Sequence, residues 1–363
     1  MLAARIARRF RALGLQRVVD RPTVVFASDD WGLLGVPDAT AFDRIRRRFG
    51  ETGLFDTHSL ETVDDLAAIG SMFARHRDAD GCPPVLSAFY VMRNIDPAAS
   101  LATGRLVVRA IDEGDPNVYE DGWWEATLDA VDRGVIAPYL HGRDHADVGR
   151  LEAALQGGDG ADVVRDLFAS GVGFHPHVLR FGAYAHEHSD LATDLEVLTE
   201  GKVLFERAFG RPATVTCPPG YRMSSGTLEA MARLGIMHVH NGGGPTMLGP
   251  VVEDGVLHVP RNVSFEPAIR GDQVTAVLPI VHELVRAGFP VVLSTHAVNF
   301  QTRLVDHRAP TLDAIDAVCT ELEQAYPDLR YVSAEALRGQ LRRPGLRVRP
   351  RRAVLRALRA QSR

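Results

Sequence analysis

The chain has 363 residues, of which 45% are hydrophobic and 24% charged, and this is the composition of an ordinary globular protein. No apolar run approaches the roughly 20 residues that a membrane-spanning helix needs. The three cysteines, Cys82, Cys217 and Cys319, are far apart and show no CxxC spacing, which argues against a disulfide framework and a structural cysteine–zinc site.

The formal net charge of −5 conceals an asymmetry along the chain. Residues 1–22 contain six arginines and one aspartate, and residues 338–363 contain ten arginines and no acidic residue. The intervening residues 23–337 carry a net charge of −20. Solvated terminal segments are one explanation. The other is contact with an anionic membrane surface, because RIARRFRALGL in the first segment is amphipathic.

The same segments bear on localisation and domain organisation. Arginines interrupt the N-terminal segment where a signal peptide needs a continuous apolar stretch. We therefore expect a cytoplasmic protein that contacts the inner membrane face through its basic ends. The acidic body argues against a nucleic-acid partner. The expected organisation is a basic segment at 1–22, one globular domain at 23–337 and an arginine-rich tail at 338–363.

Apolar runs and helical patterns alternate along the body. Seven short apolar runs predict strands, at 23–28, 85–92, 134–141, 214–219, 235–240, 256–260 and 290–296. Most are continuously apolar, which is typical of parallel strands covered on both faces. Helical patterns begin at Trp123 and span 189–210, 224–235, 271–288 and 309–327. The alternation predicts an α/β fold with a mostly parallel sheet, and the lack of GxGxxG after the first strand favours a barrel.

Polar residues that can do chemistry stand at the ends of these strands. Asp29 and Asp30 close the first strand, His141 closes another, and His145 follows four residues later. His296 ends the last strand. Because the carboxyl ends of the strands in a parallel barrel form one rim, we expect these side chains to converge.

The residue types indicate a hydrolytic metal site. Two histidines at HxxxH spacing and one carboxylate can hold a divalent metal such as zinc and leave a fourth position for water. A metal lowers the pKa of such a water to roughly 7. A second carboxylate can then take a proton from the water, and a histidine across the pocket can protonate the leaving group. One aspartate of the pair would neutralise the metal and the other would act as a base.

Four short motifs resemble those of the NodB-type polysaccharide deacetylases, carbohydrate esterase family 4. SDDWG resembles the T-F-D-D-G motif, and 141-HGRDH-145 is similar to H-[ST]-x-x-H. The sequence 217-CPPGYR-222 is similar to R-P-P-Y-G, and LSTH at a strand end resembles L-x-H. The resemblance runs in the same order from about residue 23 to 337.

The resemblance implies a fold, a cofactor and a reaction. The fold is a distorted (β/α)7 barrel, and the cofactor is one divalent metal, with zinc as the expected ion. Asp30, His141 and His145 would be the metal ligands, Asp29 the general base and His296 the general acid. The implied reaction removes an acyl group, expected to be N-acetyl, from an amino sugar or a glycan precursor.

Some residues depart from the family's pattern. Cys217 stands where the family has an arginine that holds the base, and Arg222 or Arg261 could substitute for it. Gly142 replaces a serine or threonine, and residues 260–267 lack the family's D-x-x-D-W pattern. A catalytically degenerate barrel that binds glycan or a glycan-assembly partner is therefore an alternative. A glycosidase that pairs Asp29 with a distant carboxylate is a third hypothesis.

Further residues near the expected rim are candidates for substrate contact, each with an ordinary structural role as the alternative. They are Trp31, His175, His177, Pro219, Tyr221, Arg222, His240, Asn241, Arg261 and Asn299. Trp31 could stack on a sugar or pack in the core, and Asn299 could bind a hydroxyl or orient His296. The segment 173–188 holds four histidines, for which a second metal site is a less favoured hypothesis. Cys217 as a nucleophile is less favoured still, because the sequence identifies no partner histidine.

Overall fold

The computed structural model describes residues 16–51, 53–114, 119–175, 191–242 and 247–343. Its centre is a ten-stranded sheet. The strands are β2 (Thr23–Trp31), β3 (Leu86–Tyr90), β6 (Ile136–Leu140), β7 (Val215–Thr216), β8 (His238–Gly242), β9 (Val251–Glu253), β10 (Val256–Arg261), β11 (Val263–Ser264), β12 (Val291–His296) and β13 (Arg330–Tyr331). The strand order is β11-β12-β2-β3-β6-β7-β8-β10-β9, with β13 beside β2, and every pairing except β9 with β10 is parallel.

The predicted α/β class and its seven strands are confirmed, since β2, β3, β6, β7, β8, β10 and β12 all lie within or beside the predicted apolar runs. The strand β2 is buried along its whole length, as expected for a strand covered on both faces. β7 is shorter than predicted and covers only residues 215–216. The next residues are Cys217 and two prolines, which cannot donate to a strand ladder. They lead into the 3-10 turn η2 (Pro219–Tyr221).

The sheet curls back on itself at one point of the chain. The two ends of the parallel part, β10 and β11, are consecutive strands separated by Asn262 alone. Asn262 accepts a hydrogen bond from the backbone of Val292 and donates to the carbonyl of Pro290, both next to or within β12. Among the described residues no backbone ladder joins β10 to β12. A side chain therefore bridges the gap that a regular barrel would close with strand pairing.

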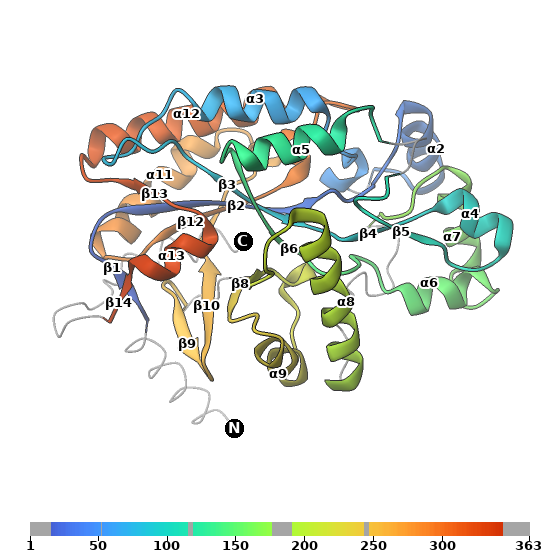
Figure 1. Ribbon diagram of the computed structural model, residues 1–363. Helices are drawn as coiled ribbons and strands as arrows, with labels where there is room; N and C mark the ends of the chain where they lie inside the picture. Colours follow the sequence, from blue (N-terminus) through green and yellow to red (C-terminus); the bar gives the residue numbers. More distant parts are fainter. Residues whose placement is uncertain (1–15, 52, 115–118, 176–190, 243–246, 344–363) are drawn as a thin grey trace, which may run out of the picture.

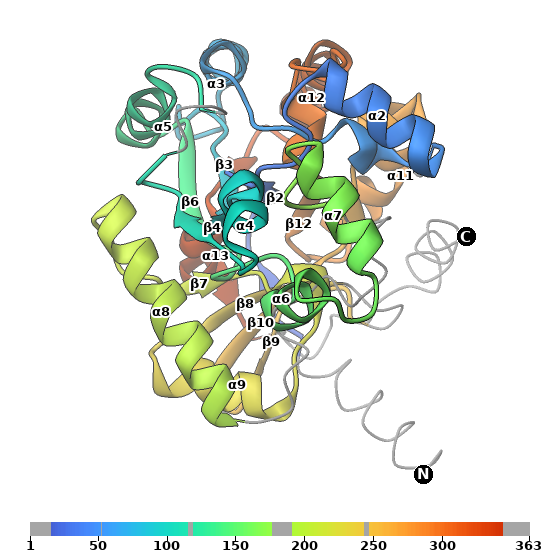
Figure 2. The ribbon, with the colours of Figure 1, turned by 90° about the vertical axis from the view of Figure 1, so that its right-hand side faces the viewer.

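Helices surround this sheet. They are α2 (Ala39–Phe49), α3 (Val63–Phe73), α4 (Pro97–Thr103), α5 (Trp123–Asp132), α6 (Val148–Leu155), α7 (Ala161–Ala169), α8 (Leu191–Phe209), α9 (Ser225–Arg233), α10 (Pro267–Arg270), α11 (Gln273–Arg286), α12 (Arg308–Ala325) and α13 (Ala334–Gln340), with short turns η1 (Leu54–Thr57) and η3 (Ala297–Phe300). Figure 1 shows α3, α5 and α12 along one side of the sheet, and Figure 2 shows α8, α9 and α11 completing the ring. The five predicted helices are confirmed as α5, α8, α9, α11 and α12. The first two residues of the predicted helix 189–210 lie outside the described residues.

A second packed layer lies beyond the carboxyl ends of the strands, on the right of Figure 1. It contains α2, α4, α6 and α7 with the antiparallel pair β4 (Arg93–Ile95) and β5 (Val108–Ala110). Its own apolar cluster includes Ile45, Val91 and Phe168. The segments of this layer follow β2, β3 and β6 in the chain, so the layer lies around the rim where the site residues were predicted.

The opposite end of the sheet is covered by α13. Ala334 of this helix donates its backbone N–H to the Ser87 hydroxyl on β3, at 2.9 Å. Glu335 likewise donates to the Tyr139 hydroxyl on β6, at 3.1 Å. The interior behind α13 is apolar, with Val25, Phe89 and other buried side chains in one cluster. A single end, the carboxyl end of the strands, is thus left for a site.

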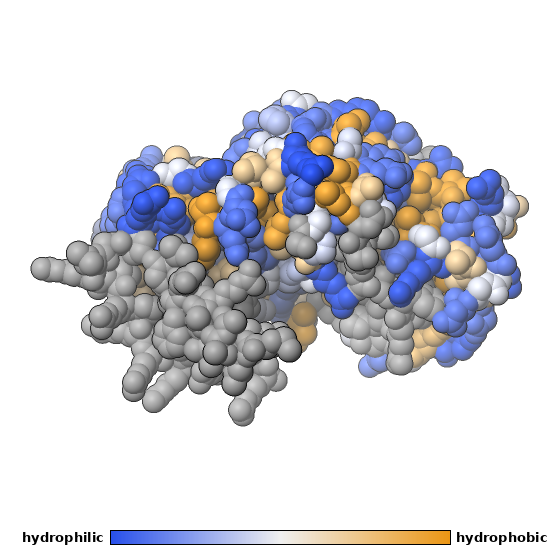
Figure 3. Space-filling model, turned by 90° about the horizontal axis from the view of Figure 1, so that it is seen from below, coloured by the Kyte–Doolittle hydropathy of each residue, from blue (hydrophilic) through white to orange (hydrophobic). Residues whose placement is uncertain are grey.

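The ordered chain extends past the predicted 23–337 body at both ends. The strands β1 (Val18–Val19) and β14 (Leu341–Arg342) pair antiparallel, with Val18 opposite Arg342. The predicted amphipathic segment before Gln16 lies outside the described residues. In the described part of the chain no helix is long and apolar enough to cross a membrane. Seen from below, hydrophilic residues dominate the coloured surface, with apolar residues in patches between them (Figure 3).

Candidate metal centre

The two adjacent aspartates end β2 in an irregular backbone. Asp30 has φ +65°, a left-handed conformation that is uncommon for any residue but glycine. The pairing of β2 with β3 shifts register between Ser28 and Trp31, which marks a bulge. Bulges re-aim side chains next to functional sites. Here Asp29 and Asp30 contact different partners.

The Asp30 carboxylate meets both histidines of the HxxxH motif. Its Oδ1 lies 3.1 Å from His141 Nε2 and 3.0 Å from His145 Nε2. The three side chains are buried, and their ligand-type atoms lie within 4.8 Å of one another. The structure therefore brings together the three predicted metal ligands.

The hydrogen bonds around His141 favour a cation between these groups. His141 Nδ1 donates to the backbone carbonyl of Cys217, 2.6 Å away, because a carbonyl can only accept. In the neutral imidazole this leaves a lone pair on Nε2, which points at the Asp30 carboxylate. Two acceptors at 3.1 Å repel each other unless a proton or a metal lies between them. One carboxylate and two imidazoles is a donor set that zinc and similar divalent metals accept.

The pKa of Asp30 agrees with this arrangement. Burial alone would raise the pKa of this carboxyl group, but with protons on the histidine nitrogens that face it, the His145 charge and the hydrogen bonds from both histidines hold it well below its usual range. A divalent ion in place of those protons would lower the pKa of Asp30 in the same direction. Asp30 is therefore a carboxylate at neutral pH. An anionic ligand with two neutral imidazoles leaves a divalent ion with a net positive charge.

A second group of ligand-type atoms, Asp29, His141 and Cys217, lies beside the first. Its atoms already have partners: Arg261 contacts Asp29, and His141 Nδ1 donates to the Cys217 carbonyl. Burial raises the pKa of the Cys217 thiol well above its usual value, so it stays protonated at neutral pH. The same property speaks against Cys217 as a nucleophile. Asp30, His141 and His145 are therefore the candidate metal ligands.

Asp29 is held by Arg261, which reaches it from β10. Arg261 Nη2 lies 2.5 Å from Asp29 Oδ1, and both side chains are almost fully buried. The guanidinium also lies over the Phe89 ring, 4.7 Å from its centroid. Cys217 donates its thiol to the other Asp29 oxygen at 3.6 Å. Of the two arginines that could replace the family's arginine, Arg261 contacts Asp29, whereas Arg222 is exposed.

His296, at the end of β12, is paired with a residue that the sequence analysis missed. Its Nδ1 donates to Glu266 Oε1 at 2.6 Å. Burial lowers the pKa of His296, but the Glu266 charge and hydrogen bond outweigh it and raise the pKa to about 10. The imidazole is therefore charged at neutral pH, and its other nitrogen, Nε2, can donate a proton. The only sequence signal for Glu266 was its place just after a predicted strand, within residues 260–267.

Two of the predicted substrate contacts are structural instead. Trp31 is fully buried and packs against Tyr90 and Phe300, with ring centroids 6.1 and 5.7 Å away. Asn299 is also fully buried, and its amide donates to Glu266 and to the backbone carbonyl of His296. Trp31 therefore cannot stack on a sugar, and the Asn299 amide holds Glu266 and the backbone of His296 rather than binding a hydroxyl.

Two predicted histidine contacts are also corrected. The side chain of His240 lies in the interior of the sheet rather than on its rim. Its ring stacks on that of His238 and packs on Phe89, with the His240 and Phe89 ring centroids 5.2 Å apart. His175 is buried, with Nε2 3.1 Å from Asp56 Oδ1. His177, together with His186 and His188, lies outside the described residues.

The remaining predicted contacts lie around Asp29 and on β8. Pro219 is buried, and the hydroxyl of Tyr221 lies 3.4 Å from Ser294 Oγ, while Tyr221 has φ +59°. Asn241 lies on the rim of β8 with its amide 3.3 Å from His258 Nδ1. Tyr221 and Asn241 are partly exposed and can still reach a bound molecule.

No family model and no curated protein matches this chain. Solved structures align with most of it. A candidate polysaccharide deacetylase of Mycobacterium smegmatis is 16% identical, with a TM-score of 0.45 over 92% of this chain and 96% of that one. A candidate polysaccharide deacetylase of Pseudomonas aeruginosa PAO1 is 10% identical, with a TM-score of 0.48 over 88% and 90%. A carbohydrate esterase family 4 pseudoenzyme of Bacillus anthracis is 9% identical, with a TM-score of 0.39 over 86% and 65%. All three belong to the group of proteins that the sequence motifs resemble, and at these identities any conclusion about function rests on the residues of the site.

Proposed function

We propose that this chain is a metal-dependent hydrolase that removes an acyl group, expected to be acetyl, from an amino sugar or a glycan precursor. One observation carries the proposal: Asp30, His141 and His145 meet next to a second, separately paired carboxylate, Asp29. The charged imidazole of His296 ends the strand that pairs with β2, in register with Asp29. The substrate class comes from the motif resemblance.

The chain's own residues can carry the proton transfers of amide hydrolysis. Asp29, held by its ion pair with Arg261, takes a proton from the water whose oxygen attacks the amide carbonyl carbon. His296, kept charged by Glu266, donates a proton from Nε2 to the amide nitrogen as the carbon–nitrogen bond breaks. The products are a carboxylic acid and the free amine. A divalent metal held by Asp30, His141 and His145 would supply Lewis acidity, which polarises a carbonyl and makes water more acidic.

The second candidate is a barrel that binds a glycan without turning it over. Replacement of the family's arginine by Cys217 was the reason to consider it. The contact between Arg261 and Asp29 supports catalysis instead, because it gives the base the same kind of partner from another strand. The glycosidase hypothesis has less support, since Asp29 pairs with Arg261 and Glu266 with His296.

Metal content and acetate release test the proposal together. We expect about one divalent ion per chain by elemental analysis, lost in His141→Ala, since three protein ligands define one such site. We expect the wild type to release acetate from N-acetylated oligosaccharides. Asp29→Asn should keep the metal and lose activity by about 10²- to 10⁴-fold, the usual contribution of a general base.

Two results would contradict this. Absence of metal from the wild type even after incubation with zinc would leave glycan binding as the better explanation. Full activity of Asp29→Asn would show that Asp29 is not the base.

A further inference from the structure

The loop between His141 and His145 contains two charged residues whose side chains point away from the metal ligands, into a network with β4 and α8. Arg93 donates through Nε and Nη2 to the two oxygens of Asp144, each at 2.8 Å, and through Nη1 to Glu200 at 2.9 Å. Arg143 donates to Asp144 and to Glu200, each at 2.7 Å. Each carboxylate therefore receives both guanidinium groups.

Burial makes this network different from the surface ion pairs elsewhere on the chain. The side chains of Asp144, Arg143 and Arg93 are only 4%, 11% and 15% exposed, and Glu200, at 43%, lies at the solvent edge of the network. Charge-assisted, bidentate contacts in such an environment hold a fixed geometry, whereas exposed pairs contribute little.

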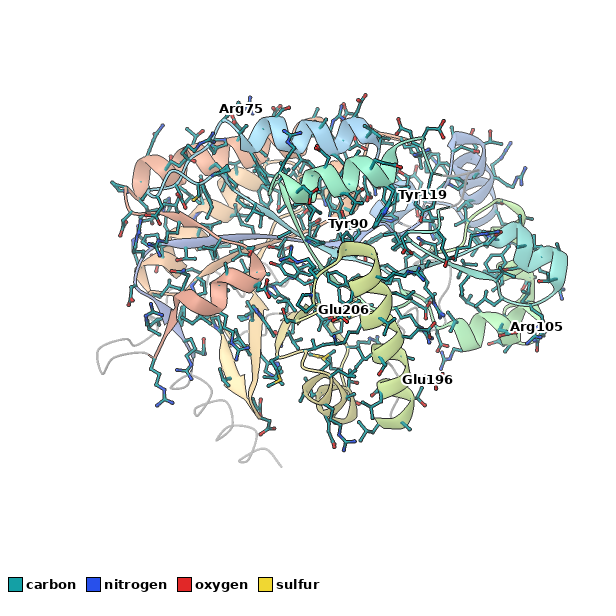
Figure 4. All side chains as sticks on the ribbon, in the orientation of Figure 1. Arg75, Tyr90, Arg105, Tyr119, Glu196 and Glu206 are labelled. Carbon is teal, nitrogen blue, oxygen red and sulfur yellow. The ribbon has the colours of Figure 1, made fainter. Side chains whose placement is uncertain are left out.

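Backbone contacts tie the same loop to the neighbouring strand. Arg143 accepts a hydrogen bond from the backbone N–H of Arg93 at 2.8 Å, and Gly142 accepts one from Met92 at 3.1 Å. The N–H of His141 donates to the Tyr90 carbonyl at 2.8 Å. The ring of Tyr90 packs on Phe209 at the end of α8, with centroids 5.0 Å apart (Figure 4). The loop is thus fixed on one side by β3 and β4 and on the other by α8.

Gly201 allows α8 to approach this closely. A Cβ atom at position 201 would lie 3.1 Å from the backbone nitrogen of Arg143 and 3.3 Å from its Cβ. That is tighter than ordinary contact, and the nearest atom belongs to the backbone of the ligand loop. Glycine inside a helix costs about 1 kcal/mol relative to alanine. Close packing on the loop is a physical reason for a glycine here.

We propose that Arg93, Arg143, Asp144, Glu200 and Gly201 act as positioning residues, through which α8 holds His141 and His145 in place for the metal. The inference rests on the proposed function, because it requires that these histidines bind a metal. None of these five residues contributes a ligand atom to the metal site. Residues around metal ligands commonly set metal affinity through ligand orientation, and a loss of such a contact weakens affinity about 10- to 100-fold.

Zinc affinity of the full chain, measured by competition with a chromophoric chelator, tests this. Glu200→Gln should raise the zinc dissociation constant about tenfold or more. Gly201→Ala should also raise it, although alanine favours the helix by about 1 kcal/mol. Two variants serve as matched controls. Arg207 lies on α8 like Glu200, and Arg207→Gln removes its ion pair with Asp112, which is outside the network. Gly339→Ala adds a methyl group in α13 at a place where no atom lies within 4 Å. Both controls should keep wild-type affinity.

The outcomes separate this inference from the proposed function. Tight zinc binding by the wild type with unchanged affinity in Glu200→Gln and Gly201→Ala overturns the inference alone. Failure of the wild type to bind zinc overturns both. An equal loss in a control variant also overturns the inference, because the effect would then not depend on the network. Thermal unfolding of the metal-free proteins shows whether each variant is folded. If Glu200→Gln is not folded, the zinc affinity of Gly201→Ala decides between the outcomes.

Discussion

Arg261 and Asp29 form a buried ion pair across the site, with Nη2 and Oδ1 2.5 Å apart although 232 positions separate the residues in the chain. The pair joins the end of β2 to the end of β10, strands that are not neighbours in the sheet order. It fixes the proposed base in place and lies next to the atoms that would hold the metal.

Breaking this pair should destabilise the fold because it leaves a carboxylate buried without a partner. We expect Arg261→Met to lower the free energy of unfolding by about 3–5 kcal/mol. Asp29→Asn/Arg261→Met should recover part of that loss, since the uncompensated charge is then gone. Urea unfolding of the wild type, both single variants and the double variant measures the coupling. Additive losses would mean that the two side chains do not stabilise each other.

The pH dependence of turnover should report on Glu266. His296 must be protonated to donate, so activity is present below its pKa and lost as the pH rises through it. Glu266 raises that pKa to about 10, so Glu266→Gln should move the alkaline limb of the kcat profile to lower pH. The exposed Glu196→Gln on α8 is the control and should leave the limb in place. If the alkaline limb of Glu266→Gln stayed in place, Glu266 would not control the protonation of His296.

Metal binding should stabilise the folded chain through the three ligands. A ligand at 1,000 times its dissociation constant adds about 4 kcal/mol to the free energy of unfolding. We therefore expect zinc to raise the Tm of the wild type and a chelator to lower it. His141→Ala should respond to neither. An equal zinc response in both proteins would place the binding site elsewhere.

Trp31 should behave as a core residue rather than a substrate contact. It is fully buried between Tyr90 and Phe300. Trp31→Ala should lower the free energy of unfolding by about 3–5 kcal/mol, as deletion of a large buried ring does. Trp31→Phe should lose less stability and keep the wild-type KM. A large rise in KM for the folded Trp31→Phe protein would restore the sugar-stacking hypothesis.

The basic ends should bind an anionic membrane surface. Because Val18 pairs with Arg342, the arginine-rich segments that precede β1 and follow β14 join the body at one place. We expect the chain to sediment with vesicles that contain phosphatidylglycerol and not with pure phosphatidylcholine vesicles. High salt should release it, because the attraction is electrostatic. Equal distribution between the two kinds of vesicle would contradict a charge-driven interaction.

Local patterns were sufficient for much of the fold. Continuous apolar runs predicted the seven strands because each is covered on both faces, and helical spacing predicted α5, α8, α9, α11 and α12. The convergence of Asp30, His141 and His145 also followed from the sequence. Asp30 and His141 stand at strand ends and His145 follows His141 by four residues, and parallel strands bring such ends to one edge.

The partners of Asp29 and His296 depended on the tertiary structure. No local signal could choose Arg261 over Arg222 for Asp29, since that choice depends on how far the sheet curls between β10 and β2. Glu266 was missed because its role comes from reaching His296 across β11 and β12. Trp31 and His240 stand beside polar strand ends in the sequence, yet a bulge and strand alternation turn both into the interior. The sequence by itself therefore determined that Asp29, Asp30, His141 and His296 come to one rim, because each stands at the end of a parallel strand, and packing between distant strands decided which way each side chain points and what charge lies beside it.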